Sequence, residues 1–210
     1  MGYSTQIDFS YTVLLLYMSF LVPFGKQKTR VMSIAMPFNF NQWIKDNRDK
    51  LKPPVANKSI YPMGKDFIVM VVGGPNARKD YHFNETEELF YQLEGDIEVT
   101  IQQDGKAIKV PIKEGEMFLL PANIPHNPRR SANSIGLVIE RVRKGTDYKD
   151  GLMWFCDECN HKLYEERFTL NDIVVDFLDV FKKFYSSEEH RTCNNCGYVM
   201  ETDPKFTNDK

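Results

Sequence analysis

The stretch DYHFNETEELFYQLEG (residues 80–95) alternates like a β-strand on both sides of a polar turn. It places His82 before the turn and Glu88 at the start of the second alternating run. Because every second residue of a strand faces the same side, His82 and Glu88 can point at one target from two adjoining strands. The stretch therefore predicts a strand pair that carries two of the ligands of a metal site.

A third ligand is expected from the end of another strand. Only four histidines exist, and His126 stands in GEMFLLPANIPHNPRR, just after a predicted strand and a proline-rich turn. Two imidazoles and one carboxylate, with open coordination positions, suit a non-haem Fe(II) that binds both a substrate and dioxygen. A single histidine beside acidic residues is more often part of a solvated turn, so this interpretation depends on the wider pattern.

The composition is typical of a soluble globular protein. Hydrophobic residues make up 42% of the 210-residue chain, which is enough for a sizeable core. The net charge of −2 gives no electrostatic reason to expect nucleic acid or an acidic membrane surface as a partner. The stretch KKFYSSEEHR (182–191) is mixed in sign, which also argues against nucleic acid.

Residues 1–31 read differently from the rest of the chain. The apolar run YTVLLLYMSFLVPF (11–24) is shorter than a membrane-spanning helix, and its basic cluster follows it instead of preceding it, unlike a secretory signal. Met32 and Met36 stand just before the sequence that begins to look like a domain. We expect an upstream-start artefact or a loosely held extension, with a membrane anchor or signal as the alternative.

Several short β-type runs lie between residues 67 and 143, separated by Gly, Pro, Asn or Asp. Closely spaced strands without helices between them favour an antiparallel sandwich or barrel. A helix is predicted before them, over 39–51, and an amphipathic helix after them, within 170–189. We predict an extension over 1–31, a β-barrel over 32–148, and a cysteine-bearing module with a tail over 149–210.

All four cysteines fall into two CxxC pairs, CDEC and CNNC. Two such pairs that close on each other form a tetrahedral four-thiolate site for Zn or Fe. Two disulfides are the alternative, but without a convincing signal peptide a reducing, cytoplasmic compartment is favoured, and with it a metal. The predicted ligands are Cys156, Cys159, Cys193 and Cys196, while His161 and His190 are interpreted as surface residues.

The spacing of these residues resembles the two cupin motifs. The first motif is represented by His82, Glu88 and Gly95, and the second by Gly115, Pro121 and His126. Asn84 stands where the first motif usually has a second histidine, so the site becomes a three-ligand site.

A narrower resemblance, to the 3-hydroxyanthranilate 3,4-dioxygenase family, covers about residues 36–200. VGGPNARKDYH, EELFYQLEG, LLPANIPHNPRR, GLVIERVR and the two CxxC pairs agree with it in order and spacing. The resemblance implies an all-β dominated cupin (double-stranded β-helix) barrel with an N-terminal helix and a small C-terminal helix-containing module. In short members of the family that module holds a rubredoxin-like four-cysteine site, which implies a structural role for the second metal.

The resemblance implies an Fe(II)-dependent, extradiol-type ring-cleaving dioxygenase. Its reaction converts 3-hydroxyanthranilate and O2 to 2-amino-3-carboxymuconate semialdehyde, which cyclises to quinolinate on the kynurenine route to NAD. The resemblance implies that the iron is held by His82, Glu88 and His126. It also implies that the substrate contacts Glu88, Arg130 and Glu140, and that Arg78 lies on the side of the iron where oxygen binds.

The residues themselves support an arginine near the metal. Arg78 precedes His82 by four residues and Arg130 follows His126 by four, so each can reach the metal face from its own loop. A planar guanidinium matches the ring carboxylate of the substrate. Arg129, adjacent to Arg130, stays open as the residue that binds this carboxylate.

Glu140 lies in the alternating run SIGLVIERV, where it shares one face with Gly136 and Val138, while Arg141 points the other way. An inward glutamate in an apolar strand is costly unless it is paired. A ligand-facing role and a buried ion pair with an arginine are both open.

Two other functions stay open: another iron cupin oxygenase acting on a different small aromatic or a thiol, and a non-catalytic cupin that senses a ligand. The paired arginines and Glu140 favour the ring-cleaving dioxygenase over another oxygenase. The intact metal ligands argue against a sensor. No membrane partner is expected, and a homodimer stays open.

Overall fold

The computed structural model describes residues 34–52, 57–171 and 173–207. Contacts between residues divide the chain into Met1–Asn39 and Phe40–Lys210, and all elements described below belong to the second unit. Residues 34–39 form neither helix nor strand. The extension predicted over 1–31 lies outside the described residues, and the division into 32–148 and 149–210 stays a prediction.

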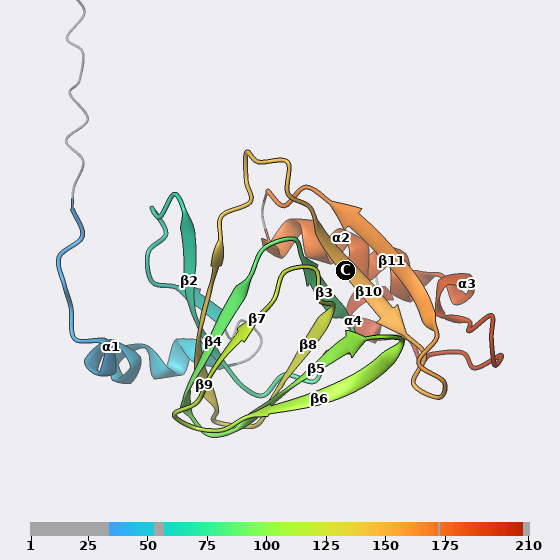
Figure 1. The fold of residues 1–210 in the computed structure, drawn as a ribbon, viewed down its shortest axis with the longest axis horizontal. Coiled ribbons are helices and arrows are strands. Elements are labelled where there is room, and N and C mark those ends of the chain that lie inside the picture. Colours follow the sequence, from blue (N-terminus) through green and yellow to red (C-terminus); the bar gives the residue numbers. More distant parts are fainter. Residues whose placement is uncertain (1–33, 53–56, 172, 208–210) are drawn as a thin grey trace, which may run out of the picture. The chain divides into compact units, whose positions relative to one another are not determined.

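Two antiparallel sheets make up most of the described fold (Figure 1). The five-stranded sheet has the order β1-β2-β9-β4-β7 and the six-stranded sheet the order β11-β10-β3-β8-β5-β6. The bounds in the first sheet are β1 Asn57–Ser59, β2 Phe67–Gly73, β4 Glu88–Glu94, β7 Met117–Leu120 and β9 Ile135–Arg141. Those in the second are β3 Tyr81–Asn84, β5 Ile97–Gln103, β6 Lys106–Ile112, β8 His126–Arg130, β10 Asp150–Phe155 and β11 Lys162–Phe168.

Helices are few among the described residues. Helix α1 spans Phe40–Asn47 and continues into the 3-10 helix η1 at Arg48–Leu51, while α2 spans Ile173–Ser186. The short helices α3, Glu188–Arg191, and α4, Pro204–Thr207, follow α2. The predicted fold class is confirmed: a mainly-β protein with an N-terminal helix and a helix-containing C-terminal part that brings the four cysteines together. No described helix is both long enough and apolar enough to cross a membrane.

The core between the sheets follows from strand alternation. In β4, Glu88, Phe90 and Gln92 are buried on one face, as the period of two requires. Phe90 packs in a cluster with Val99 of β5 and Val138 of β9, which come from different sheets. The Asp-Gly turn predicted from QQDGKA joins β5 to β6, and both of its central residues have positive φ.

A second apolar cluster joins the C-terminal helix to the six-stranded sheet. Leu152 and Trp154 of β10 pack against α2, where the Trp154 and Phe184 rings stack with centroids 4.2 Å apart. The sequence predicted this amphipathic helix, but it did not predict the β10–β11 hairpin beneath it. Strand β10 is buried along nearly its whole length, so its sequence DGLMWF does not alternate.

Candidate metal centre

Strand pairing brings the two site histidines together. His82 of β3 lies directly opposite His126 of β8 in the antiparallel register. After β3 the chain crosses to the five-stranded sheet, where Glu88 is the first residue of β4, so the strand pair predicted for residues 80–95 is wrong: β3 and β4 lie in different sheets. The crossing turn is fixed by Asn84, whose Oδ1 accepts hydrogen bonds from the backbone N–H and the hydroxyl of Thr86, both at 2.8 Å. Asn84, which replaces the second motif histidine, thus helps to place Glu88.

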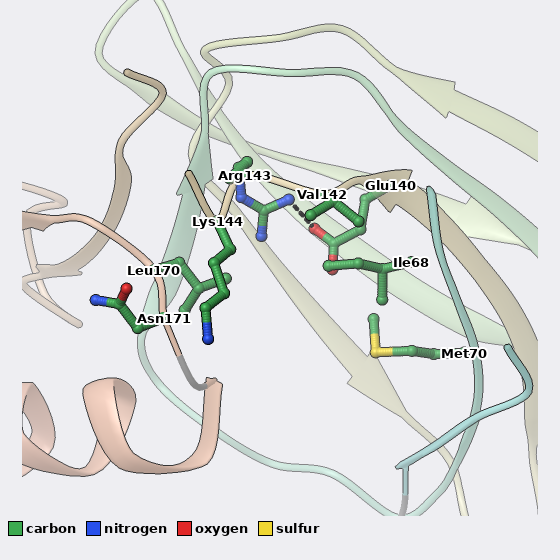
Figure 2. Close-up of a pocket in the computed structure, with 8 residues that line it drawn as sticks. All are labelled: Ile68, Met70, Glu140, Val142, Arg143, Lys144, Leu170 and Asn171. Atoms are coloured by element: carbon green, nitrogen blue, oxygen red, sulfur yellow. Dashed lines mark hydrogen bonds and ion pairs between the residues drawn. The ribbon is translucent and has the colours of Figure 1, made fainter. Parts of the chain in front are cut away.

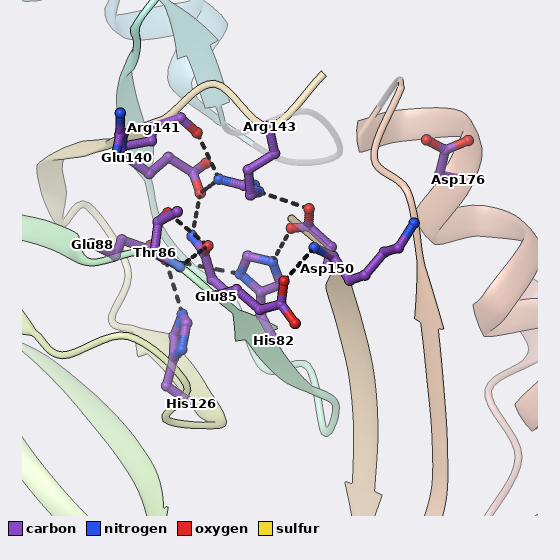
Figure 3. A network of polar contacts seen from close by, with 12 residues as sticks. His82, Glu85, Thr86, Glu88, His126, Glu140, Arg141, Arg143, Asp150 and Asp176 are labelled. Carbon is purple, nitrogen blue, oxygen red and sulfur yellow. Dashed lines mark hydrogen bonds and ion pairs between the residues drawn. The ribbon is translucent and has the colours of Figure 1, made fainter. Parts of the chain in front are cut away.

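The three predicted ligands converge in the interior (Figure 3). Oε2 of Glu88 lies 3.2 Å from Nε2 of His126 and 3.8 Å from Nδ1 of His82. One donor atom from each residue lies within 4.8 Å of the others, and all three residues are buried. The set can hold one metal ion from two imidazoles and one carboxylate, with coordination positions left open.

Hydrogen bonds on the far side of each ring determine which nitrogen faces this cluster. Nε2 of His82 lies 2.7 Å from Oδ1 of Asp150, and Nδ1 of His126 lies 3.0 Å from the carbonyl oxygen of Ile124. A carboxylate and a carbonyl only accept, so these two nitrogens carry the hydrogens. In the neutral rings the lone pairs of the other two nitrogens then point towards Glu88.

This arrangement fits a cation. Oε2 of Glu88 is buried and has no hydrogen-bond donor among the described residues, although two ring nitrogens approach it. Two nitrogen lone pairs and a carboxylate oxygen repel one another unless positive charge lies among them. A divalent metal would satisfy all three atoms.

The pKa shifts show the same demand for positive charge. Burial raises the pKa of Glu88, but the charges of His126 and His82 outweigh this effect and lower the pKa to about 2. Burial lowers the pKa of His126, and the nearby Glu88 carboxylate more than reverses this, so its pKa lies above the ordinary value. The pKa of His82 is lowered by burial despite its bond to Asp150. Glu88 is therefore ionised at any working pH and needs a cationic partner.

Arg130 points into the interior with unused donors. It lies at the end of β8, is only 5% exposed, and its Nη1 has no hydrogen-bond partner among the described residues. Burial lowers its pKa to about 10, with the Glu88 carboxylate acting in the opposite direction. A Cβ at Gly136 would lie 2.9 Å from Nη1, so glycine at that position leaves room for the guanidinium.

Arg129 points the other way. It is exposed, and its Nε donates to Oδ1 of Asn127 at 3.2 Å. Of the two adjacent arginines, Arg130 is therefore the one that can meet a ligand inside the barrel.

Arg78 is engaged by its own loop and by the C-terminal helix. Its guanidinium donates to the carboxylate of Asp80 through Nε, at 2.9 Å, and through Nη2. It also lies over the rings of Phe177 and Phe181, at 5.8 and 5.4 Å from their centroids. The Glu88 carboxylate acts electrostatically on Arg78, which places it near the metal centre. Its role in binding oxygen stays a prediction.

Glu140 forms the buried ion pair that the sequence left open, while its ligand-facing role stays a prediction. It lies opposite Glu88 in the pairing of β9 with β4, and its Oε2 accepts from Nη1 of Arg143 at 2.7 Å and from Nδ2 of Asn84 at 3.1 Å. The buried ion pair is thus present. Burial and the neighbouring Glu88 charge raise the pKa of Glu140 to about 7, although Arg143 opposes this.

Glu140 also borders a cavity of about 150 Å³ (Figure 2). Ile68 and Met70 of β2 line the same cavity, together with Arg143 and with Leu170 from the segment before α2. Ile68, Glu140 and Glu88 pair across three neighbouring strands, but the residues that line the cavity include none of His82, Glu88, His126 and Arg130.

The sequence did not identify Asp150 and Arg143 as parts of the site. Both are fully buried, and Nε of Arg143 donates to Oδ2 of Asp150 at 2.7 Å. One available sign was Asp150 itself, a charged residue immediately before the apolar run GLMWF. The other was the three-residue spacing from Glu140 to Arg143. Neither sign reveals that Asp150 contacts His82 and Arg143.

The four cysteines also come together. The distance from Sγ of Cys156 to Sγ of Cys196 is 3.6 Å and that from Cys159 to Cys193 is 3.5 Å, with all four thiols free. A tetrahedral zinc site with bonds of about 2.3 Å has sulfur–sulfur distances of about 3.8 Å, close to those found. His161 is exposed, and neither His161 nor His190 belongs to a ligand cluster within the described part of the chain.

Comparisons with known proteins give the family and relatives of this chain. The model of the 3-hydroxyanthranilic acid dioxygenase family matches residues 32–185. A 3-hydroxyanthranilate 3,4-dioxygenase of Xanthomonas campestris pv. campestris (strain 8004) is 53% identical over 82% of this chain and 97% of the relative. One of Bacillus thuringiensis (strain Al Hakam) is 46% identical over 78% of this chain and 90% of the relative.

Among solved structures, a cupin-2 domain containing protein from Shewanella frigidimarina is similar with a TM-score of 0.38 and 21% identity, over 50% of this chain and 94% of that chain. Protein NMB1881 from Neisseria meningitidis has a TM-score of 0.39 and 22% identity, over 51% of this chain and all of that one.

Proposed function

The chain belongs to the 3-hydroxyanthranilic acid dioxygenase family, and from this premise we propose that it is an iron-dependent enzyme that opens the ring of 3-hydroxyanthranilate with dioxygen. The product would be 2-amino-3-carboxymuconate semialdehyde, the precursor of quinolinate on the route from kynurenine to pyridine nucleotides. The observation that carries the proposal is the convergence of two imidazoles and a buried carboxylate, whose charge acts on the buried Arg130 with its unpaired Nη1.

Fe(II) would be held by Nδ1 of His82, Nε2 of His126 and Oε2 of Glu88. When bound, it would supply the coordination sites for the amino and hydroxyl groups of the substrate and for dioxygen, and the route for electrons between them. The chain itself would contribute orientation, charge neutralisation and a site lined by apolar residues.

Arg130 would bind the ring carboxylate through its unused donors. Its Nη1 lies beside Gly136, and Gly136 is four residues from Glu140 along β9, or about 13 Å at the usual strand rise. That span leaves room for one substituted ring between the guanidinium and the metal. The ring would lie over Val138 and Phe90, the inward pair between those two positions.

Glu140 would accept a hydrogen bond from the amino or hydroxyl group of the substrate. Its Oε2 is occupied by Arg143 and Asn84, while its Oε1 takes no hydrogen bond from the described residues and the side chain borders the cavity. The ion pair would thus orient Glu140 towards the substrate, so the two roles left open by the sequence would be compatible.

The four cysteines would hold a second divalent metal, Zn or Fe, with a structural role. Their tetrahedral spacing supports this, as does their place in the fold: Cys156 follows β10 directly and Cys193 comes after α3, so one ion would join the end of β10 to the chain after α3. Free thiols at metal-binding spacing also favour the cytoplasmic location predicted from the sequence.

The experiment is turnover of the iron-loaded full chain under oxygen-18, with 2-aminophenol as the substrate lacking the carboxylate. We expect a semialdehyde that contains both atoms of one O2 molecule. The kcat/KM for 2-aminophenol should be lower by about 10- to 100-fold, because a charge-assisted contact is lost. Binding of 3-hydroxyanthranilate without product would favour a ligand-sensing protein. Equal turnover of both compounds would favour a different oxygenase.

A further inference from the structure

A buried chain of polar contacts leads from the metal centre to Glu140 through two residues without a role so far (Figure 3). Nε2 of His82 contacts Oδ1 of Asp150 at 2.7 Å, and Oδ2 of Asp150 accepts from Nε of Arg143 at 2.7 Å. Nη1 of Arg143 then donates to Oε2 of Glu140 at 2.7 Å. Asp150 and Arg143 are both fully buried.

We propose that Asp150, held in place by Arg143, is a positioning residue that fixes His82 in the tautomer whose Nδ1 is free to bind the metal. The inference rests on the proposed function, because it requires a metal at His82, Glu88 and His126. It assigns Asp150 no contact with the substrate or with the reacting atoms.

Among the described residues, Asp150 is the acceptor that contacts Nε2 of His82. Asp150 is the first residue of β10, which pairs with β3 so that Leu152 lies opposite His82 and Asp150 opposite Asn84. The other ring neighbours of His82 are Phe177 and His126, with centroids at 5.4 and 5.3 Å, and neither offers an acceptor to Nε2. Without Asp150 the imidazole proton would distribute between both nitrogens, and only one of the two tautomers presents a lone pair to the metal.

Arg143 holds the carboxylate of Asp150 in one orientation. A buried carboxylate is costly unless a charge or hydrogen bond compensates it, and Nε of Arg143 provides both. The backbone of Arg143 is held in turn by Thr146, whose N–H and hydroxyl donate to its carbonyl oxygen at 3.0 and 2.7 Å. One guanidinium thus orients the aspartate behind a metal ligand and the glutamate facing the cavity.

Replacing Asp150 by asparagine separates this role from a purely structural one. Nε–H of Arg143 needs an acceptor, so the amide oxygen of D150N would face Arg143 and its NH2 group would face His82. A donor at that place forces Nε2 of His82 to accept, which moves the ring proton to Nδ1, the atom that faces the metal. D150N preserves the volume of the side chain, whereas D150A leaves a cavity and allows either tautomer.

The two roles therefore predict opposite orders for the loss of metal affinity in D150N and D150A. If Asp150 sets the tautomer, D150N weakens metal binding by about 10- to 100-fold, at least as much as D150A does. If Asp150 only packs and pairs with Arg143, D150A has the larger effect and D150N the smaller one.

The experiment uses full-length chain labelled with nitrogen-15 in histidine, together with zinc competition titrations made after the four-cysteine site has been filled. Nitrogen-15 shifts identify the protonated nitrogen of each ring, and H161Q and H190Q remove the signals of the other two histidines. We expect metal-free wild type to carry the His82 proton on Nε2 and D150N to carry it on Nδ1. The control D147N changes an exposed aspartate three residues earlier and keeps the wild-type affinity.

Wild-type protein with the His82 proton on Nδ1 overturns the inference, and so does D150N with wild-type zinc affinity. Either result, with ring cleavage by the wild type intact, leaves the proposed function standing. Wild type that binds no metal at His82 overturns both. If neither Asp150 variant folds, the wild-type tautomer still decides.

Discussion

Oε2 of Glu88 lies 3.2 Å from Nε2 of His126, and the two residues come from opposite sheets of the barrel. His82, the partner of His126 in strand pairing, completes the cluster from the same sheet as His126. A metal bound here would join the two sheets, so metal binding is expected to depend on the barrel and to stabilise it.

Metal affinity should depend on pH through His126. Glu88, with a pKa of about 2, stays ionised, and its charge raises the pKa of His126 above 6.5. A proton on Nε2 competes with the metal, so the dissociation constant for zinc should rise by about tenfold for each pH unit below the pKa of His126. Competition titrations between pH 6 and 8.5 measure this. An affinity that does not change over that range would contradict the assignment of Nε2 as a ligand.

Arg130 should determine recognition of the substrate carboxylate. Replacing it by leucine should lower kcat/KM for 3-hydroxyanthranilate by about 10- to 100-fold, because a charge-assisted contact is lost. Turnover of 2-aminophenol, which has no carboxylate, should hardly change. The matched control is R129L, because Arg129 is adjacent in sequence but exposed. A larger loss in R129L than in R130L would reverse the assignment.

Phe177 should support the metal centre from the C-terminal helix. Its buried ring lies 5.4 Å from that of His82 and 5.8 Å below the guanidinium of Arg78. F177A should lower the free energy of unfolding by about 3–5 kcal/mol, as is usual for a buried phenylalanine, and should weaken zinc binding. The next residue, Leu178, is 37% exposed, so L178A should cost much less. Urea unfolding measures both, and equal losses in the two variants would argue against this packing.

The four-cysteine site should be structural. C196S should reduce the metal content of the chain by one equivalent and lower Tm, because the site joins the end of β10 to the segment after α3. H161A should leave metal content and Tm unchanged, since His161 is exposed and outside the cluster. Elemental analysis and thermal unfolding test this pair. Full metal content in C196S would show that fewer than four thiolates hold the ion.

The sequence predicted those parts of the site that follow from local periodicity. The four-residue spacing from His126 favoured Arg130 over Arg129, but the sequence placed Arg130 on a loop, which is wrong: both residues lie on β8, where His126 and Arg130 face one side and Arg129 the other. Glu140 was placed inward from the two-residue repeat of its predicted strand. These predictions need only the two-residue repeat of a strand and a likeness between short motifs.

The parts that the sequence did not predict depend on long-range pairing. Asp150 is 68 residues from His82, and only the register of β10 against β3 brings them together. That register cannot be read from DGLMWF, because a strand buried on both faces does not alternate. Arg143 is missed for a related reason, since its position depends on Asp150.

The most direct test of the central claim is an iron titration of protein whose four-cysteine site has been filled with zinc and whose site at His82, Glu88 and His126 holds no metal. Fe(II) is added without oxygen, and then 3-hydroxyanthranilate and air are supplied while semialdehyde absorbance is followed. We predict that activity rises in proportion to iron up to one equivalent in the wild type and stays absent in H82A, which binds no iron at this site. Ring cleavage by iron-free H82A protein would contradict the assignment of His82, Glu88 and His126 as the catalytic metal centre.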